Sequence, residues 1–151
     1  MADLNQKTAA KQFVDKWTGH GQEDEDCHIF WLGLMQDVLG IEDALDCINF
    51  EKKVKLKGAP APKRIDGYIA RSKVLIEQKS FDIDLDKPQA GHSDQTPFEQ
   101  AKFYNDNLNL DDKARWIIVS NFQEFRIYNM NDLLADPLVI PLSELPEKLS
   151  A

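Results

Sequence analysis

The chain has 151 residues, of which 42% are hydrophobic and 29% are charged, and its formal net charge is −8. A chain of this length forms one domain and can bury roughly two thirds of the surface of its unfolded form. The longest apolar stretch, IFWLGLM, is too short to span a bilayer, and the first residues lack the pattern of a signal peptide, so we expect a cytoplasmic protein with no membrane partner. The acidic balance argues against a protein that coats nucleic acid by charge alone.

The basic residues are concentrated in the middle of the chain. Residues 1–50 carry 3 basic and 10 acidic side chains, residues 51–80 carry 9 and 3, and residues 81–151 carry 6 and 13. The central segment alone is therefore basic. The two cysteines, Cys27 and Cys47, lack the spacing of a zinc site, and we expect both as reduced thiols.

Two helices are predicted within residues 7–40. The apolar positions of the first recur at helical spacing: Ala10, Phe13, Val14 and Trp17. This helix is expected to end near Gly19, and the acidic stretch GHGQEDEDC that follows is predicted as a loop. From His28 the chain is apolar on nearly all sides up to Gly40, which indicates a mostly buried helix with a glycine cap.

Three strands are expected in and around the basic segment. INFEKKVKL, residues 48–56, alternates apolar and polar side chains, which is typical of a half-buried strand. KRIDGYIA, residues 63–70, and KVLIEQKS, residues 73–80, follow after a GAPAP turn and are separated only by Arg71 and Ser72. Strands this close together in sequence predict an antiparallel meander.

A loop separates the meander from the next helix. Residues 81–95 show no period, which favours irregular structure. Their DxDxD stretch departs from a calcium-binding loop at Lys87 and Ser93, where glycine and glutamate are needed, so we expect no calcium there.

A helix, two strands and a tail complete the predicted fold. Thr96 and Glu99 form a capping-box pattern around Pro97, which indicates that a helix begins at residue 97. RWIIVSN and EFRIYNM are the next two strands, and the first of them should pair in parallel with KVLIEQKS through a crossover. The predicted class is α/β, a mixed central sheet made of an antiparallel meander and a parallel crossover strand and flanked by helices. We expect one domain, 1–151, with helices in 7–40, a core in 48–130 and a C-terminal tail in 131–151.

Two carboxylates are predicted to meet across the hairpin of the last two meander strands. A two-residue loop sets Tyr68 opposite Leu75 and Asp66 opposite Glu77, with Lys79 on the same face. Carboxylates this close repel unless a cation lies between them, and Mg²⁺ is favoured because it takes oxygen ligands and keeps water. Lys79 would then act on an attacking water or on a phosphate. The alternative is a solvated ion pair on an exposed sheet face.

The same residues resemble the core of the PD-(D/E)XK nucleases. Asp66, ten intervening residues and then Glu77, Gln78 and Lys79 match the motif, with Ile65 where the family name has proline. The resemblance implies metal ligation by Asp66 and Glu77 and catalysis by Lys79. The backbone carbonyl of Gln78 is a further candidate ligand.

The predicted helix at 97 contains a second, weaker motif. Gln100 and Tyr104 resemble the QxxxY motif of one branch of these nucleases, and a spacing of four residues puts both side chains on one face. The resemblance implies that both support the site or contact the DNA backbone. The alternative for Tyr104 is a core tyrosine.

Longer stretches resemble a more specific family. FWLGLMQDVLG, KVLIEQKS, TPFEQAKFYN and RWIIVSNFQEFRIYNM, in this order, are similar to the N-terminal endonuclease domain of the MmeI-like Type IIL restriction–modification enzymes and of relatives named as DNA methyltransferases. In that family a helical spacer, an adenine-N6 methyltransferase and a target-recognition domain follow. This chain has no NPPY motif and no glycine-rich cofactor loop, so the resemblance implies either the N-terminal part of a longer polypeptide, which we expect, or a short natural remnant of one.

The resemblance implies a Mg²⁺-dependent endonuclease that hydrolyses double-stranded DNA within a bifunctional Type II restriction endonuclease and methyltransferase. S-adenosylmethionine would bind only the methyltransferase part, and the methyltransferase and target-recognition domains would be partners in the same protein. One further acid often completes such sites, and four candidates stay open: Glu23, Glu25, Asp37 and Glu51. The candidates for contacts with DNA phosphates are Lys63, Arg64, Arg71 and Lys73, with Lys53 and Lys55 beside them.

Two other functions stay open at this point. The same fold can form a catalytically silent module that docks on or regulates a DNA methyltransferase, and it can form a nuclease for repair or for junction resolution. An intact set of two acids and a lysine favours catalysis. Failure to bind Mg²⁺ or Mn²⁺ would favour the silent module over the nuclease. Tests with junctions, DNA ends and methylated sites would distinguish a repair or junction nuclease from a restriction endonuclease.

Overall fold

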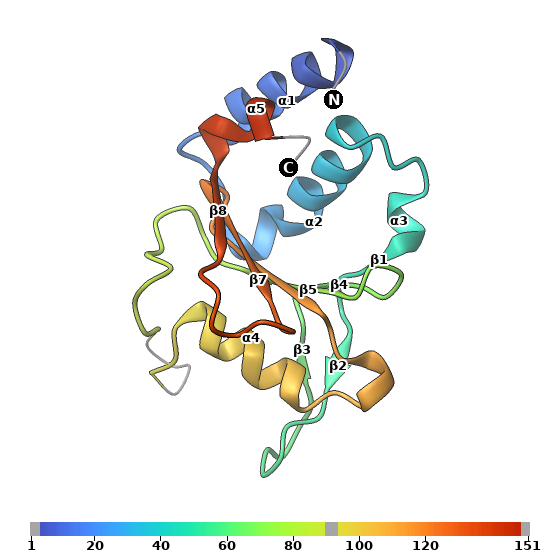
Figure 1. Ribbon diagram of the computed structural model, residues 1–151, viewed down its shortest axis with the longest axis vertical. Coiled ribbons are helices and arrows are strands. Elements are labelled where there is room, and N and C mark those ends of the chain that lie inside the picture. The colour runs from blue at the N-terminus through green and yellow to red at the C-terminus, as the bar shows by residue number, and fades with distance from the viewer. Residues whose placement is uncertain (1–3, 90–93, 149–151) are drawn as a thin grey trace.

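A mixed six-stranded sheet runs through the computed structural model, which describes residues 4–89 and 94–148 (Figure 1). Its strand order is β1-β4-β5-β6-β7-β8, and β2 and β3 form a separate pair. The strands are β1 (Ile48–Asn49), β2 (Lys53–Val54), β3 (Lys63–Arg64), β4 (Gly67–Ile69), β5 (Val74–Gln78), β6 (Trp116–Ser120), β7 (Glu124–Asn129) and β8 (Leu138–Pro141). The helices are α1 (Leu4–Trp17), α2 (Glu23–Gly33), the π-helical η1 (Leu34–Val38), α3 (Ala44–Cys47), α4 (Pro97–Asp106), the 3₁₀ helices η2 (Leu110–Asp112) and η3 (Leu142–Glu144), and α5 (Leu145–Lys148).

The sheet combines antiparallel and parallel pairing, as the sequence predicted. β1, β4 and β5 are neighbours in an antiparallel series. β5 then pairs in parallel with β6, and α4 lies in the connection between them. β7 and β8 follow as antiparallel strands. The predicted α/β class, with a parallel crossover strand in a mixed sheet, is confirmed.

Helices cover both faces of the sheet. Figure 1 shows α1, α2 and α5 on one side and α4 on the other. Alternate side chains of β5 pack on opposite faces of the sheet, because successive side chains of a strand point in opposite directions. Val74 and Ile76 join the core beside α1 and α2, whereas Leu75 joins the core beside α4. Among the helices of the described residues, none has both the length and the apolar character needed to cross a membrane.

α2 begins earlier than the sequence predicted. The acidic stretch expected as a loop supplies the first turn of α2, with four carboxylates: Glu23, Asp24, Glu25 and Asp26. Negative side chains stabilise this end of a helix, because its free backbone N–H groups carry partial positive charge. The predicted end is correct, since Gly40 has φ +70°, although the helix finishes in the π-helical turn η1.

Two predicted strands are each broken in two. Residues 48–56 form β1 and β2, which belong to different sheets because the chain turns at Phe50. Asn49 Oδ1 accepts a hydrogen bond from the backbone N–H of Glu51 (2.9 Å), a local contact that competes with strand pairing. Residues 63–70 form β3 and β4, with a bend between them. The predicted antiparallel pairing is nevertheless confirmed, because β1 pairs with β4, β2 pairs with β3 and β4 pairs with β5; only the continuity of the first two strands was predicted wrongly.

The expected tail, residues 131–151, contributes to the fold within its described part. β8 pairs with β7, with Phe125 opposite Ile140. Leu142 and Leu145 are buried in the core beside α1 and α2, and α5 lies against α1 (Figure 1). The sequence analysis expected only a tail here, whereas β8 ends in Pro141, and proline is tolerated in an edge strand.

The predicted start of α4 is confirmed. Thr96 Oγ1 accepts a hydrogen bond from the backbone N–H of Glu99 (3.2 Å), and the Glu99 carboxylate accepts one from the backbone N–H of Thr96 (2.9 Å). Pro97 occupies the start of the helix, where its missing N–H is not needed. This capping box fixes where α4 begins, and so it fixes the position of Gln100.

We expect Thr96→Ala to lower the free energy of unfolding by about 1 kcal/mol, because it removes a side-chain cap of α4. Urea denaturation measures the change. Thr8→Ala is the control, since Thr8 lies within α1 and its hydroxyl donates to the carbonyl of Leu4 instead of capping a helix. The control should change stability by less than about 0.5 kcal/mol. Equal losses in the two variants would contradict a special role for the cap.

Candidate active site

The hairpin of β4 and β5 has the register that the sequence predicted. Tyr68 lies opposite Leu75. One step further along this register, Asp66 comes opposite Glu77. Asp66 lies in the bend before β4, and its Oδ2 accepts a hydrogen bond from the backbone N–H of Gln78 (2.8 Å). A main-chain group of β5 therefore holds the Asp66 carboxylate next to Glu77.

Glu77 is a buried acid near the end of β5. Its exposed fraction is 4%. Burial raises the pKa of Glu77 well above its ordinary value, the charge and hydrogen bonding of Asp66 raise it further, and the charge of Lys79 opposes this. Two carboxyl groups that share a site favour a proton or a cation between them. Without a metal, Glu77 therefore holds its proton more strongly than an exposed glutamate does.

Lys79 connects the acid pair to α4. Its backbone N–H donates to the carbonyl of Ser120 at the end of β6 (2.7 Å), which extends the parallel pairing. Its side chain is buried, and Nζ donates to Oε1 of Gln100 (3.2 Å). Nε2 of Gln100 in turn donates to the hydroxyl of Tyr104 (2.9 Å). The two motifs found in the sequence therefore meet through Lys79 and Gln100, and the roles assigned to their residues stay predictions.

Gln78 points its side chain to the opposite face of the sheet. Its Oε1 accepts a hydrogen bond from the indole N–H of Trp31 (2.8 Å), and its Nε2 donates to the carbonyl of Lys79 (2.9 Å). The side chain of Gln78 is thus part of the core beside α2. Its contact with the site runs through the backbone N–H that holds Asp66, and metal ligation by its carbonyl stays a prediction.

α2 brings a third acid to the same place. The backbone N–H of Glu23 donates to Oγ of Ser80, the residue after Lys79 (2.9 Å). Burial raises the pKa of Glu23 to about 7, the charge of Lys79 lowers it, and the charge of Asp66 raises it. These interactions put the Glu23 carboxyl within electrostatic range of Asp66 and Lys79.

The other three candidate acids lie elsewhere. Glu25 is exposed on α2, and Asp37 lines a hollow between α1 and η1. Glu51 forms an ion pair with Arg64 (3.0 Å). The sequence could not select Glu23, because the choice depends on how α2 crosses the end of β5. Ser80, which anchors Glu23, was not foreseen, although a polar residue directly after a buried strand was a usable signal.

The cations proposed for DNA contacts separate into two groups. Lys63 and Arg64 form β3, are exposed, and lie just before Asp66 in the chain. Arg71 and Lys73 lie at the turn of the hairpin, where both contact other parts of the chain. That turn is a strand length, roughly 13 Å, from the acid pair. Only the β3 cations of this set adjoin the site.

The donor atoms of the site suit a hard cation. Asp66 and Glu77 supply carboxylate oxygens, and Glu23 lies within electrostatic range of Asp66. Within residues 4–89 and 94–148, no group of three or more His, Cys, Asp and Glu side chains is placed to hold an ion. Mg²⁺ fits the pair formed by Asp66 and Glu77, because this ion is commonly bound by one or two carboxylates and completes its coordination with waters and substrate oxygens.

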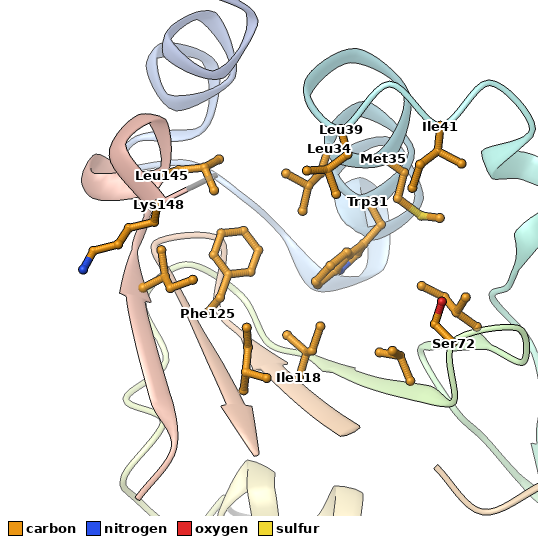
Figure 2. Close-up of a pocket in the computed structure, with 14 residues that line it drawn as sticks. Trp31, Leu34, Met35, Leu39, Ile41, Ser72, Ile118, Phe125, Leu145 and Lys148 are labelled. Carbon is orange, nitrogen blue, oxygen red and sulfur yellow. The ribbon is translucent and has the colours of Figure 1, made fainter. Parts of the chain in front are cut away.

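An apolar cavity of about 330 Å³ lies on the other face of the sheet. Figure 2 shows Trp31 and Met35 on one side of it, Phe125 and Ile118 of the sheet on the other, and Lys148 at its edge. Its lining residues include no carboxylate. The cavity therefore lacks the chemistry of the acid pair, and we assign the candidate active site to the α4 side of the sheet.

The fold and the site together define an α/β domain that presents two carboxylates and a lysine at the end of two parallel strands. The family described as MmeI, N-terminal domain matches residues 8–151, and the chain belongs to this family. The resemblance found in the sequence is thus confirmed, and it points to a restriction–modification context. Comparisons with curated proteins and with solved structures gave no match. Assignment to the PD-(D/E)XK superfamily stays a prediction.

We expect the metal-free chain to lose stability as the pH rises from about 4.5 to about 7. In this range the unfolded chain releases the proton of Glu23 while the folded chain still holds it, so a rising pH favours the unfolded state. Glu23→Gln should flatten this part of the profile, and Glu25→Gln, in the same helical turn but exposed, should not. Urea denaturation at several pH values with a chelator present measures the profile. A profile that Glu23→Gln leaves unchanged would contradict the burial of this acid.

We expect Gln78→Leu to lower the free energy of unfolding by about 1–3 kcal/mol, because it leaves the indole N–H of Trp31 buried without an acceptor. Urea denaturation measures the loss. Adding Trp31→Phe to Gln78→Leu removes that donor, so the double variant should lose less than the sum of the two single variants. Strict additivity would show that the hydrogen bond contributes nothing.

Proposed function

We propose that this chain hydrolyses phosphodiester bonds of double-stranded DNA in a Mg²⁺-dependent reaction, as the endonuclease part of a Type II restriction–modification enzyme. The observation that carries the proposal is the meeting of Asp66, Glu77 and Lys79 at the end of β5, with Gln100 on the lysine. Membership of the MmeI N-terminal domain family supports the restriction–modification context.

The burial of these charges supports a functional role. A solvated ion pair on an exposed sheet face, the alternative considered for the sequence, does not fit, because Glu77 and Lys79 are each 4% exposed. Buried charges reduce stability unless they are well paired, and perturbed acids are common at functional sites. An acid pair next to a lysine at the end of a strand is therefore better explained by a ligand than by packing.

The chemistry proposed for the site is in-line attack of water on a phosphodiester. When bound, Mg²⁺ supplies positive charge to the phosphate oxygens and lowers the pKa of a bound water. Asp66 and Glu77 are the residues that would hold it, with Glu23 as a further candidate. The water oxygen forms a bond to phosphorus and gives up a proton to solvent, and the bond between phosphorus and the bridging oxygen breaks. That oxygen leaves with the electron pair and takes a proton from solvent.

Lys79 has the position of a charge-stabilising residue in this reaction. Its ammonium group can donate a hydrogen bond to the attacking water or to a phosphoryl oxygen, where negative charge develops. Oε1 of Gln100 fixes the direction of the ammonium group, and Tyr104 contacts Gln100 from one turn further along α4. Gln100 and Tyr104 are therefore positioning residues in this proposal.

The proposal extends to the protein that carries this domain. The motif of Asp66, Glu77 and Lys79 supports membership of the PD-(D/E)XK superfamily. In the complete cytoplasmic enzyme, an adenine-N6 methyltransferase with S-adenosylmethionine and a target-recognition domain would belong to the same polypeptide. Sequence choice would then come from the target-recognition domain, and this chain would supply the cut.

Nicking of supercoiled DNA tests the proposal. We expect the chain to nick with Mg²⁺ and to stop when a chelator is added. Asp66→Ala, Glu77→Ala and Lys79→Ala should each slow nicking by at least about 100-fold. Two exposed loop positions give the controls, Asp82→Ala and Lys87→Ala, which should nick at the parent rate. If both Asp66→Ala and Lys79→Ala nick as fast as the parent, the assignment is wrong.

Metal binding by calorimetry separates the remaining alternatives. The parent and Lys79→Ala should bind Mg²⁺ or Mn²⁺, and Asp66→Ala should bind either ion much more weakly. A parent that neither binds metal nor nicks DNA would favour a silent module that docks on or regulates a methyltransferase. A strong preference for junctions or DNA ends would favour a repair or junction nuclease.

A further inference from the structure

A basic arm extends from the sheet beside the acid pair. We define it as residues 52–65, which contain β2, β3 and the turn between them, and which carry six basic and no acidic side chains. Figure 1 shows the arm reaching past α4, at the end of the molecule away from α1. We propose that the basic arm binds the sugar–phosphate backbone of duplex DNA on one flank of the cut phosphate, an inference that rests on the proposed function.

Apolar residues fix the base of the arm. Val54, Leu56 and Ile65 are buried in the core beside α4. The backbone N–H of Ile65 donates to the carbonyl of Lys52 (2.8 Å), which extends the pairing of β2 and β3. Because side chains alternate along a strand, Lys53 points away from this core. The arm therefore has an anchored face and a basic face open to solvent.

Four lysines of the arm have no acidic partner in the part of the chain that the structure describes. Within residues 4–89 and 94–148, no carboxylate lies within ion-pair distance of their ammonium groups: Lys53, Lys55, Lys57 and Lys63. Some basic side chains outside the arm have acidic partners, such as Lys102 with Asp106 (2.9 Å) and Arg126 with Asp86 (2.5 Å), whereas the described part of the chain gives Lys7 and Lys11 of α1 none. What distinguishes the arm is the gathering of six basic side chains in 14 consecutive residues without an acid among them, although Lys52 and Arg64 pair with Asp112 and Glu51 outside it. This gathering favours a polyanion as the partner.

The pairing of β2 with β3 sets two cations against each other. Lys53 lies directly opposite Arg64. Like charges at such positions destabilise a strand pair. Glu51 reduces this repulsion in part, because its carboxylate forms an ion pair with Arg64 (3.0 Å). A phosphate backbone lying across the pair would replace the remaining repulsion with attraction.

The arm lies next to the acid pair in the chain, so a duplex bound by the arm would lie close to the candidate active site. β3 runs directly towards Asp66, and Lys63 precedes Asp66 by three residues, or roughly 10 Å of extended chain. A duplex with a phosphate at the acid pair would continue past the arm. Phosphate contacts of this kind set the position of a duplex without reading its sequence. The arm would therefore orient the duplex over Asp66 and Glu77.

Salt-dependent DNA binding tests the arm with two matched variants. Lys53→Gln/Lys55→Gln changes the arm, and Lys7→Gln/Lys11→Gln changes α1; each removes two exposed lysines and alters the net charge equally. Fluorescence anisotropy with a chelator present measures binding to a duplex of arbitrary sequence. We expect the arm variant to bind several-fold more weakly and to reduce the slope of log affinity against log salt by about 2. The α1 variant should keep the parent slope, and Lys53→Arg/Lys55→Arg should restore binding.

Three results would overturn the inference. They are an arm variant that binds like the parent, an α1 variant that loses as much slope as the arm variant, and a parent that does not bind the duplex at low salt. Urea denaturation shows that each variant is folded. Nicking assays distinguish the two proposals. If the parent nicks DNA but the arm variant binds DNA as the parent does, the proposed role of the arm is rejected and hydrolysis is kept. If binding depends on the arm but the parent does not nick DNA, hydrolysis is rejected and the role of the arm is kept.

Discussion

The candidate site depends on keeping opposite charges together at the buried end of β5. A lone charge in this place is unfavourable by several kcal/mol, so Glu77 and Lys79 each need close partners. The backbone N–H of Gln78 holds the Asp66 carboxylate, and Gln100 holds the ammonium group of Lys79. These partners come from the bend before β4 and from α4, so the site exists only when the hairpin and the crossover helix are both in place.

The alternation of side chains along β5 separates chemistry from packing. Glu77 and Lys79 face α4, whereas Gln78 faces α2 and bonds to Trp31. One strand can therefore carry charges without exposing the aromatic core to them. The apolar cavity of Figure 2 lies on the packing side and adds no donor or acceptor to the acid pair.

The sequence predicted those features that depend on neighbouring residues. The hairpin register, the capping box of α4 and the parallel strand were all predicted, because turn length, cap residues and apolar runs are local signals. The breaks at Phe50 and Asp66 were missed, although Lys52 interrupts the alternation just after Phe50, because the sequence does not show which residues of neighbouring strands pair. Of four candidate acids, the sequence could not select Glu23, because its approach depends on the path of α2.

The parallel pairing of β5 with β6 also determines when during synthesis the site becomes complete. The hairpin that carries Asp66 and Glu77 involves residues close in sequence and can form early. Lys79 is fixed later, because its partners Gln100 and Ser120 emerge from the ribosome after it. A nascent chain therefore holds its acids before it holds its lysine in place. This order delays the mature arrangement until most of the domain has been made.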